Sequence, residues 1–189
     1  MKKIAHISDL HFGTVVPEIA ESLRELLHAE KPDLVIISGD LTQRATSEQF
    51  QQAKQYLDSL PRPQLVVPGN HDVPLFNLFK RFLAPLERYK RYISDDLAPT
   101  YEDDDLIVLG LTTARSTFSK NGRVSLEQID YIRKRVCGSN ERKLAVLVTH
   151  HPFLPPPEQG KGSVVGRANE LLQAIDECDL DVMLAGHFH

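Results

Sequence analysis

Five short apolar runs in this chain are each followed, at once or after one residue, by a cluster of polar residues. The runs are rich in valine, isoleucine and leucine, which is typical of parallel strands buried on both faces. The runs are residues 4–8, 34–38, 65–67, 144–148 and 182–185, and the clusters are Asp9-Leu10-His11, Gly39-Asp40, Gly69-Asn70-His71-Asp72, His150-His151-Pro152 and Gly186-His187-Phe188-His189. Since ligands bind beyond the carboxyl ends of such strands, we expect six of the eight histidines to gather at one edge of one sheet.

The composition indicates one globular domain over residues 1–189, with 41% hydrophobic and 25% charged residues. A net charge of -4 gives no general attraction to nucleic acid or anionic lipid, so any affinity for phosphate has to be local. The two cysteines, Cys137 and Cys178, are too few for a disulfide framework, and we find neither a signal-peptide core nor a long apolar span. We therefore expect a cytoplasmic protein without a membrane span and without a nucleic-acid partner.

Helical periodicity fills the segments between the runs. The expected helices are residues 17–30, 47–60, 125–136 and 169–177. The first of them joins two strands in a βαβ unit, for which a right-handed crossover is expected. Pro85 interrupts a further helical pattern and has to break it into two short helices. Residues 101–110 predict a hairpin with Asp103 to Asp105 as its turn.

The spacing of the polar residues indicates metal ligands. Asp9 and His11 are separated by one residue, as are His187 and His189, and in an extended backbone this spacing points both side chains the same way. Each pair can therefore hold one ion. Asp40 is the only acidic residue of its cluster, which makes it the natural bridging carboxylate.

The number of ligands favours two ions over one. The candidate ligands are Asp9, His11, Asp40, Asn70, His150, His187 and His189. They are too many for a single tetrahedral zinc ion, whereas sharing Asp40 gives four protein ligands per ion and leaves room for a bridging hydroxide and a substrate oxygen. Carboxylate, amide and imidazole ligands without thiolate favour manganese, iron or zinc over copper(I), and the choice among the three stays open.

The five clusters, in this order from Asp9 to His189, resemble the calcineurin-like metallophosphoesterase superfamily. The resemblance implies an α/β fold, an αββα sandwich of two mixed β-sheets flanked by helices. It also implies that His71 contacts the phosphate and the leaving group. The ligand sets that it implies are Asp9, His11, Asp40 and His189 for one ion, and Asp40, Asn70, His150 and His187 for the other.

Several features are similar to the bacterial cyclic-nucleotide phosphodiesterase branch of this superfamily. They are Gly39-Asp40-Leu41-Thr42, residues 69–91 and Thr112-Thr113-Ala114-Arg115-Ser116. Family members normally continue past the last histidine with further strands, whereas this sequence stops at His189. We therefore expect either a fragment of a longer protein or a last ligand on a fraying end.

Other polar residues allow two interpretations. His151 is an alternative ligand to His150, but the family pattern His-x-Pro favours His150 and leaves His151 on the substrate side. His6 lies inside an apolar strand, which favours a packed core residue over a ligand. Asp72 either orients His71 or caps the following turn.

Two basic groups carry similar alternatives. The first group consists of Lys80, Arg81, Arg88, Lys90 and Arg91. We interpret it as the solvated face of amphipathic helices, and the alternative is that it recruits a phosphorylated substrate. Arg115 and Arg123 either bind a phosphate or nucleotide or lie at the surface, and we retain Arg115 as a candidate substrate-binding residue with His71 and His151.

The sequence thus predicts a hydrolase that cleaves a small phosphate ester, preferably a diester such as a cyclic nucleotide, by attack of a metal-bridging hydroxide. Asp40, Asn70 and His71 are its candidate catalytic residues. Asn70 and His71 would steady the phosphoryl oxygens, and His71 would protonate the departing oxygen. The alternatives are a phosphomonoesterase or nuclease of the same superfamily, and a non-catalytic binding scaffold, although no ligand residue is missing. A homodimer is left open.

Overall fold

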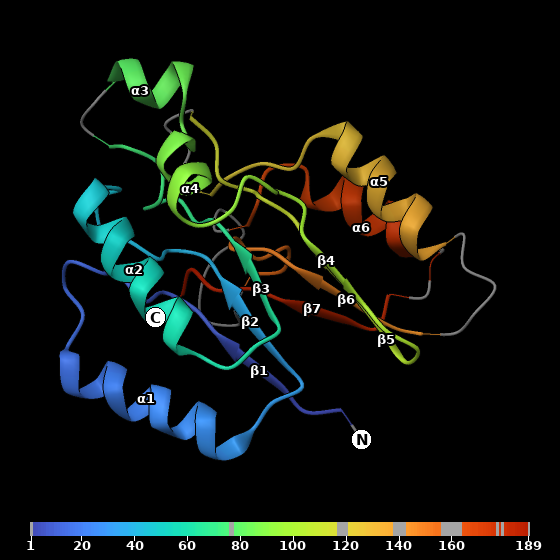
Figure 1. Ribbon diagram of the computed structural model, residues 1–189. Helices are drawn as coiled ribbons and strands as arrows, with labels where there is room; N and C mark the ends of the chain where they lie inside the picture. The colour runs from blue at the N-terminus through green and yellow to red at the C-terminus, as the bar shows by residue number, and fades with distance from the viewer. Residues whose placement is uncertain are drawn as a thin grey trace.

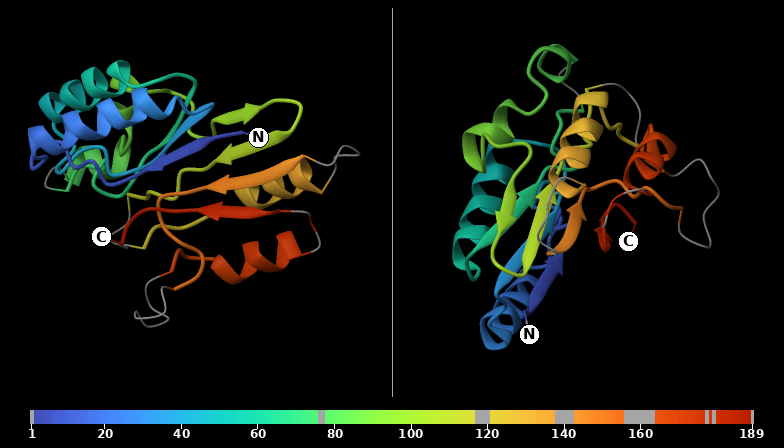
Figure 2. Two further views of the ribbon diagram at one scale, coloured as in Figure 1. Left: turned by 90° about the horizontal axis from the view of Figure 1, so that it is seen from below. Right: turned by 90° about the vertical axis from the view of Figure 1, so that its right-hand side faces the viewer.

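The computed structural model describes residues 2–75, 78–116, 121–137, 143–155, 164–176, 178 and 180–188, which form two sheets between two layers of helices (Figures 1 and 2). The first sheet has the order β1-β2-β3 and is parallel, and its strands are β1 (Ile4–Ile7), β2 (Leu34–Ser38) and β3 (Gln64–Val67). The second sheet has the order β4-β5-β6-β7, and its strands are β4 (Thr100–Glu102), β5 (Leu106–Gly110), β6 (Leu144–Val148) and β7 (Val182–Leu184). This sheet is mixed, since β4 is antiparallel to β5 and the other pairs are parallel.

The expectation that the histidines gather at one edge of a single sheet is wrong, because β6 and β7 pair with β5 and not with the first three strands. An apolar run shows that a strand is buried on both faces, but it carries no information on which strand is its neighbour. The αββα arrangement implied by the resemblance is confirmed. The hairpin is also confirmed, with β4 and β5 joined through Asp103.

Alternate residues of the strands separate the core into layers. The side chains between the two sheets are Leu34, Ile36, Leu65, Val67, Leu106, Val108, Val146 and Val148. Their neighbours Val35 and Ile37 point to the other face and pack under the helices. Burial of each such side chain contributes roughly 1.5–3 kcal/mol.

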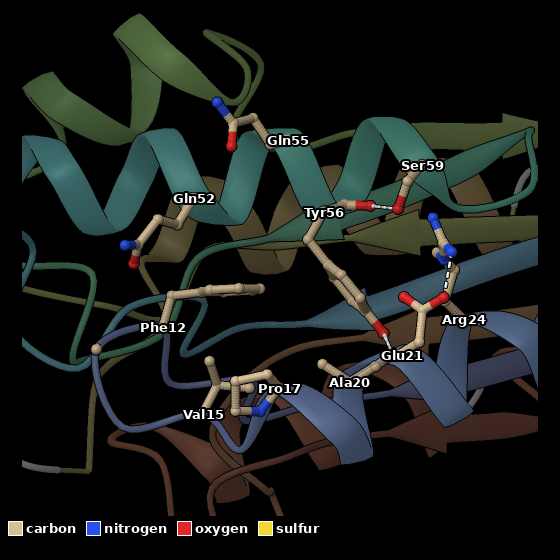
Figure 3. Close-up of a pocket in the computed structure, with 11 residues that line it drawn as sticks. Phe12, Val15, Pro17, Ala20, Glu21, Arg24, Gln52, Gln55, Tyr56 and Ser59 are labelled. Atoms are coloured by element: carbon tan, nitrogen blue, oxygen red, sulfur yellow. Dashed lines mark hydrogen bonds and ion pairs between the residues drawn. The ribbon is translucent and has the colours of Figure 1, made fainter.

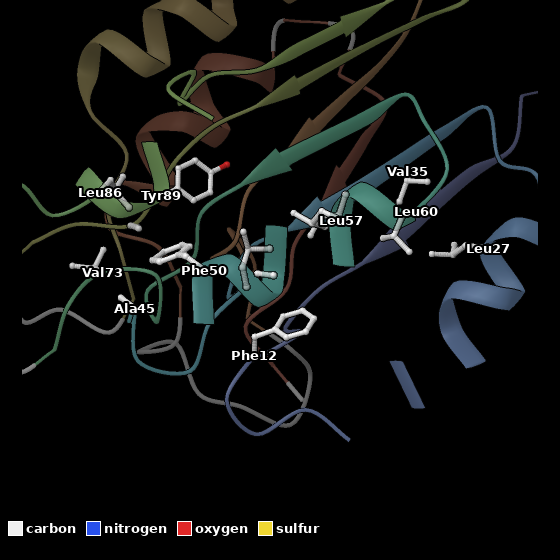
Figure 4. Packing of buried hydrophobic residues seen from close by; sticks show 14 residues of the cluster. Phe12, Leu27, Val35, Ala45, Phe50, Leu57, Leu60, Val73, Leu86 and Tyr89 are labelled. Atoms are coloured by element: carbon white, nitrogen blue, oxygen red, sulfur yellow. The ribbon is translucent and has the colours of Figure 1, made fainter. Parts of the chain in front are cut away.

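Helices cover the outer face of each sheet. On the first sheet lie α1 (Pro17–Glu30), α2 (Ser47–Ser59) and α4 (Glu87–Tyr92), whose Leu27, Phe50 and Tyr89 pack on that face (Figure 4). On the second lie α5 (Leu126–Val136) and α6 (Ala168–Asp176). The break at Pro85 is confirmed, because α3 (Leu78–Leu83) ends before it and α4 begins after it.

Local sequence signals explain where these helices begin and end. α1 begins at Pro17, whose fixed φ suits a first helical residue. The Thr46 side chain caps α2 by accepting the N–H of Gln49, and Ser125 forms a capping box with Gln128 at α5. No helix among the described residues is long and apolar enough to span a membrane.

A disulfide between Cys137 and Cys178 ties the end of α5 to the segment after α6, with 4.7 Å between the two Cα atoms. The two cysteines that are too few for a framework therefore form a single bond between two helices on the outer side of the second sheet.

A groove of about 640 Å³ runs along α1 and α2 (Figure 3). Tyr56 lies at its centre and donates its hydroxyl to Ala20 O at 2.8 Å, and Glu21 and Arg24 pair at its edge. None of the candidate ligands that the structure describes lines this groove, and their chemistry lies elsewhere.

Candidate metal centre

The loops after the strands of both sheets are joined by backbone hydrogen bonds. Asp9 N donates to Gly39 O at 3.0 Å, which joins the loops after β1 and β2. Gly186 N donates to His150 O at 3.0 Å, which joins the loops after β7 and β6. The two sheets meet where His187 N donates to the carboxylate Oδ2 of Asp9 at 3.1 Å. The centre therefore lies across two sheets.

Asp40 lies between two histidines. Its Oδ2 is 3.8 Å from His11 Nε2 and 3.3 Å from His150 Nε2. His11 Nε2 is also 3.9 Å from Asp9 Oδ1, and His150 Nε2 is 3.1 Å from Asn70 Oδ1. In a zinc site each donor lies about 2.0–2.2 Å from the metal. Two donors of one ion are then separated by distances like the four donor-to-donor distances given above. The donor set fits metal ions on both sides of Asp40.

Three groups of candidate ligand atoms each lie within 4.8 Å of one another. They are His11, Asp40 and His71; Asp9, Asp40 and His150; and His150, His151 and His187. Asp40 and His150 each belong to two of the groups, and of the two only the carboxylate of Asp40 has two oxygens with which to join two ions. His151 and His71 extend the cluster beyond the ligand sets expected from the sequence.

The backbone is left-handed at four of the candidate ligands. Their φ angles are 57° at Asp9, 47° at His11, 51° at Asp40 and 78° at His187. Such angles are uncommon for residues other than glycine and gather at functional sites. The expectation that Asp9 and His11 converge through an extended backbone is therefore wrong. Their side chains meet because the chain turns sharply at both residues.

Two glycines leave the space that the ligands occupy. Gly39 has a φ of 89°, and a Cβ atom built there would lie 2.7 Å from His150 Nδ1. A Cβ atom at Gly69 would overlap with Oδ1 of Asp40. Any larger residue at either position would displace a candidate ligand.

Asp40 is almost completely buried, and burial by itself opposes ionisation of its carboxyl group. The hydrogen bond and charge of His150, with the N–H of His71 at 2.8 Å from Oδ1, outweigh burial and lower the pKa of Asp40. Burial likewise opposes the charged form of His150, but Asp40 outweighs it and raises the His150 pKa. A bound cation would favour the ionised form of Asp40 further.

Asp72 joins the loop after β2 to the loop after β3. Its carboxylate accepts the N–H groups of Leu41, Thr42 and Gly69 at 3.2, 2.9 and 2.9 Å. Burial and the neighbouring charge of Asp40 raise its pKa to about 6. These contacts differ from both expected roles, because the carboxylate closes the turn that precedes Asp72 and begins at Gly69, and binds the loop after β2.

Backbone carbonyls orient two of the histidines. His150 Nδ1 lies 2.9 Å from Ser38 O, and His71 Nδ1 lies 2.9 Å from Gln43 O. A carbonyl oxygen only accepts, so Nδ1 carries a hydrogen in both rings, and in the neutral form of each ring Nε2 keeps its lone pair. This is the usual arrangement around a ligand histidine.

Residues 2–189 match the sequence model of the calcineurin-like phosphoesterases. The chain belongs to this family. One relative is the glycerophosphodiester phosphodiesterase GpdQ of Enterobacter lignolyticus (strain SCF1), 28% identical over 170 residues that cover 80% of this chain and 57% of the relative. Another is the 3',5'-cyclic adenosine monophosphate phosphodiesterase CpdA of Escherichia coli (strain K12), 25% identical over 165 residues that cover 80% and 56%. The chain thus spans a little more than half the length of these two relatives.

A solved structure supports the fold of this calcineurin-like chain. The phosphopantetheinyl hydrolase PptH from Mycobacterium tuberculosis superposes with a TM-score of 0.57 at 17% identity, covering 100% of this chain and 83% of PptH. At such low identity the likeness shows the fold alone.

For one site residue predicted from the sequence, Arg115, the side-chain contact that the structure describes lies outside the cluster. His189 lies outside the described residues. Arg115 is half-buried, and its guanidinium donates to Gln128 Oε1 at 2.7 Å. Burial and the neighbouring charge of Arg123 lower the pKa of Arg115. Its role as a substrate-binding residue stays a prediction.

The interpretation of the first basic group as a solvated helix face is wrong for Arg81. This residue is buried and donates to the carbonyl oxygens of Ser116 and Pro74. Arg88 is half-buried and also binds a backbone carbonyl, that of Ala45. Both arginines fasten the segment around α3 and α4 to neighbouring loops, a use that helical periodicity alone does not reveal.

His6 is exposed on β1, and its Nε2 lies 2.7 Å from Ser38 Oγ, so the prediction of a packed core residue is wrong. β1 lies at the edge of the first sheet, which an apolar run cannot show. The carbonyls of Ser38 and Gln43 were also missed, because backbone atoms leave no distinctive sequence signal. Thr113 lies in a segment that the sequence did single out, but nothing in that segment indicates a contact between its hydroxyl and His151.

Proposed function

We propose that this chain hydrolyses a phosphodiester with two divalent metal ions that share Asp40. The observation that carries the proposal is the position of the buried Asp40 carboxylate between His11 and His150. The proposed ligands are Asp9, His11, Asp40 and His189 for one ion, and Asp40, Asn70, His150 and His187 for the other. When bound, such ions lower the pKa of water and neutralise charge on phosphoryl oxygens.

Charge supports an anionic substrate. Two divalent ions less the carboxylates of Asp9 and Asp40 leave a charge of +2, so a phosphate is attracted although the whole chain carries -4. Manganese, iron and zinc all suit this donor set. The names of the relatives favour a diester over a monoester, and a small diester such as a cyclic nucleotide is the proposed substrate class.

His71 is proposed to contact the phosphoryl group and the leaving oxygen. Because its Nδ1–H is held by Gln43 O, the neutral ring offers only a lone pair at Nε2. His71 can therefore donate a proton from Nε2 only in its doubly protonated form, which it would regain from water after each turnover.

A substrate panel tests this proposal. The manganese-loaded protein would be assayed on bis-p-nitrophenyl phosphate, p-nitrophenyl phosphate, 3',5'-cyclic AMP, a glycerophosphodiester and single-stranded DNA. We expect the diesters of small molecules to be cleaved fastest. We also expect Asp40→Asn to abolish cleavage, while the matched surface variant Asp58→Asn keeps normal rates. Exclusive cleavage of the monoester, or of DNA, would instead favour the phosphomonoesterase or the nuclease.

A further inference from the structure

His151 forms part of the wall of the metal centre. It is completely buried, and its ring centroid lies 4.8 Å from those of His150 and His187. One nitrogen of each of these three rings lies within 4.8 Å of the other two. His151 is therefore either a further metal ligand or a group that contacts what binds at the metals. The hydrogen position on its ring separates these two roles, because a ligand nitrogen needs a lone pair.

The hydroxyl of Thr113 determines that hydrogen position. Thr113 Oγ1 lies 2.7 Å from His151 Nδ1 and also accepts the backbone N–H of His151 at 3.3 Å. The hydroxyl has one hydrogen to donate, and Nδ1 is the acceptor that these contacts provide. Assigning the O–H of Thr113 to Nδ1 on this ground puts the hydrogen of the neutral ring on Nε2.

The adjacent histidine has the opposite arrangement. His150 Nδ1 faces the carbonyl oxygen of Ser38, so Nδ1 carries a hydrogen, and in the neutral ring Nε2 has a lone pair for a metal. His151 Nδ1 faces a hydroxyl instead, so Nε2 offers an N–H. Two consecutive histidines thus differ in what they present to the centre, a lone pair from His150 and a hydrogen-bond donor from His151.

The ring of His151 is held in place from several sides. Thr113 is completely buried, and its own carbonyl accepts the N–H of Arg123 at 2.9 Å. Thr149 donates its hydroxyl to His151 O at 2.9 Å. A Cβ atom at Gly122, where φ is 65°, would lie 2.5 Å from His151 Nδ1. A donor fixed in this way needs no rearrangement when charge develops nearby.

We propose that His151 is a catalytic residue that donates a hydrogen bond from Nε2 to a phosphoryl oxygen of the bound substrate, and that Thr113 is a positioning residue that fixes its tautomer. The inference rests on the proposed function for its substrate. It assigns different roles to two histidines, because His71 can donate only when its ring is doubly protonated, whereas His151 donates from its neutral ring.

Nitrogen NMR of the histidine side chains tests the tautomer directly. In the metal-free protein with ¹⁵N-labelled histidine, we expect His151 to have hydrogen on Nε2 and His150 to have hydrogen on Nδ1, with assignments taken from single histidine variants. Thr113→Val removes the hydroxyl at nearly constant volume and should broaden or shift the His151 signals, whereas Thr113→Ser should retain them. Hydrogen on Nδ1 of His151 in the wild type would overturn the proposal.

Metal binding and kinetics test the role of that hydrogen. His151→Ala should keep the manganese stoichiometry and affinity of the wild type while kcat on a small diester falls about 10²–10³-fold, the usual cost of losing one such donor. Thr113→Val should also lower kcat, whereas Thr113→Ser should keep kcat near the wild-type value. Loss of one metal ion in His151→Ala would make this residue a ligand and contradict the proposal. If the wild type cleaves no diester, the proposed function fails, and the NMR result still decides the tautomer.

Discussion

His71 differs from its neighbour Asn70 in what it can contribute. Asn70 lies 3.1 Å from His150 Nε2 through its side-chain oxygen, which places it among the candidate ligands. The His71 ring is held by Gln43 O and packs edge-on to His11, with 4.9 Å between the ring centroids. We therefore propose that Asn70 holds metal and that His71 serves the leaving group.

Replacement of His71 by alanine tests that division of roles. Both metal ions should remain, because Asn70 is the proposed ligand. For a diester that releases an alkyl oxygen, we expect the rate to fall about 10²–10⁴-fold, since that oxygen needs a proton on departure. For bis-p-nitrophenyl phosphate the loss should be much smaller, because nitrophenolate leaves as a stable anion. Steady-state rates of one metal-loaded preparation on both substrates provide the comparison. Equal losses would indicate that His71 acts only by contact with the phosphoryl group.

The helices and strands could largely be predicted from the sequence because their signals are local. Pro17, Pro85 and Ser125 mark helix starts or breaks in the structure as they do in the sequence. The pairing of strands could not be predicted, because the register that joins Leu106 to Leu144 depends on contacts between distant segments. For the same reason the sequence predicts Asp40 as a bridging residue but does not predict the left-handed backbone turn that places it.

The disulfide between the end of α5 and the segment after α6 makes a measurable contribution to the stability of the folded state. It closes a loop with a sequence separation of 41 residues, and such bonds typically stabilise the folded state by about 2–4 kcal/mol. Cys137→Ser combined with Cys178→Ser should therefore lower Tm by roughly 4–16 °C. Differential scanning calorimetry without reductant measures the shift, and the wild type in reductant is the control. An unchanged Tm in the double variant would show that the bond does not form or does not constrain the unfolded chain.

In the whole molecule, the sandwich brings candidate ligands from two sheets together. Asp9 from the first sheet and His187 from the second are joined by a hydrogen bond of 3.1 Å, and Asp40 and His150 approach to 3.3 Å across the same boundary. Neither sheet alone carries all the proposed ligands. The packing of Leu34, Val108 and the other side chains between the sheets therefore also holds the candidate ligands together.

Titration of the metal-free protein with Mn²⁺ in a calorimeter tests whether the chain binds two ions that share Asp40. Two ions that share Asp40 predict a stoichiometry of two per chain for the wild type and for Asp58→Asn. Asp40→Asn should weaken both binding events, because the shared carboxylate contributes to both sites. Saturation of the wild type at one ion per chain, or two ions bound with unchanged affinity in Asp40→Asn, would contradict the account.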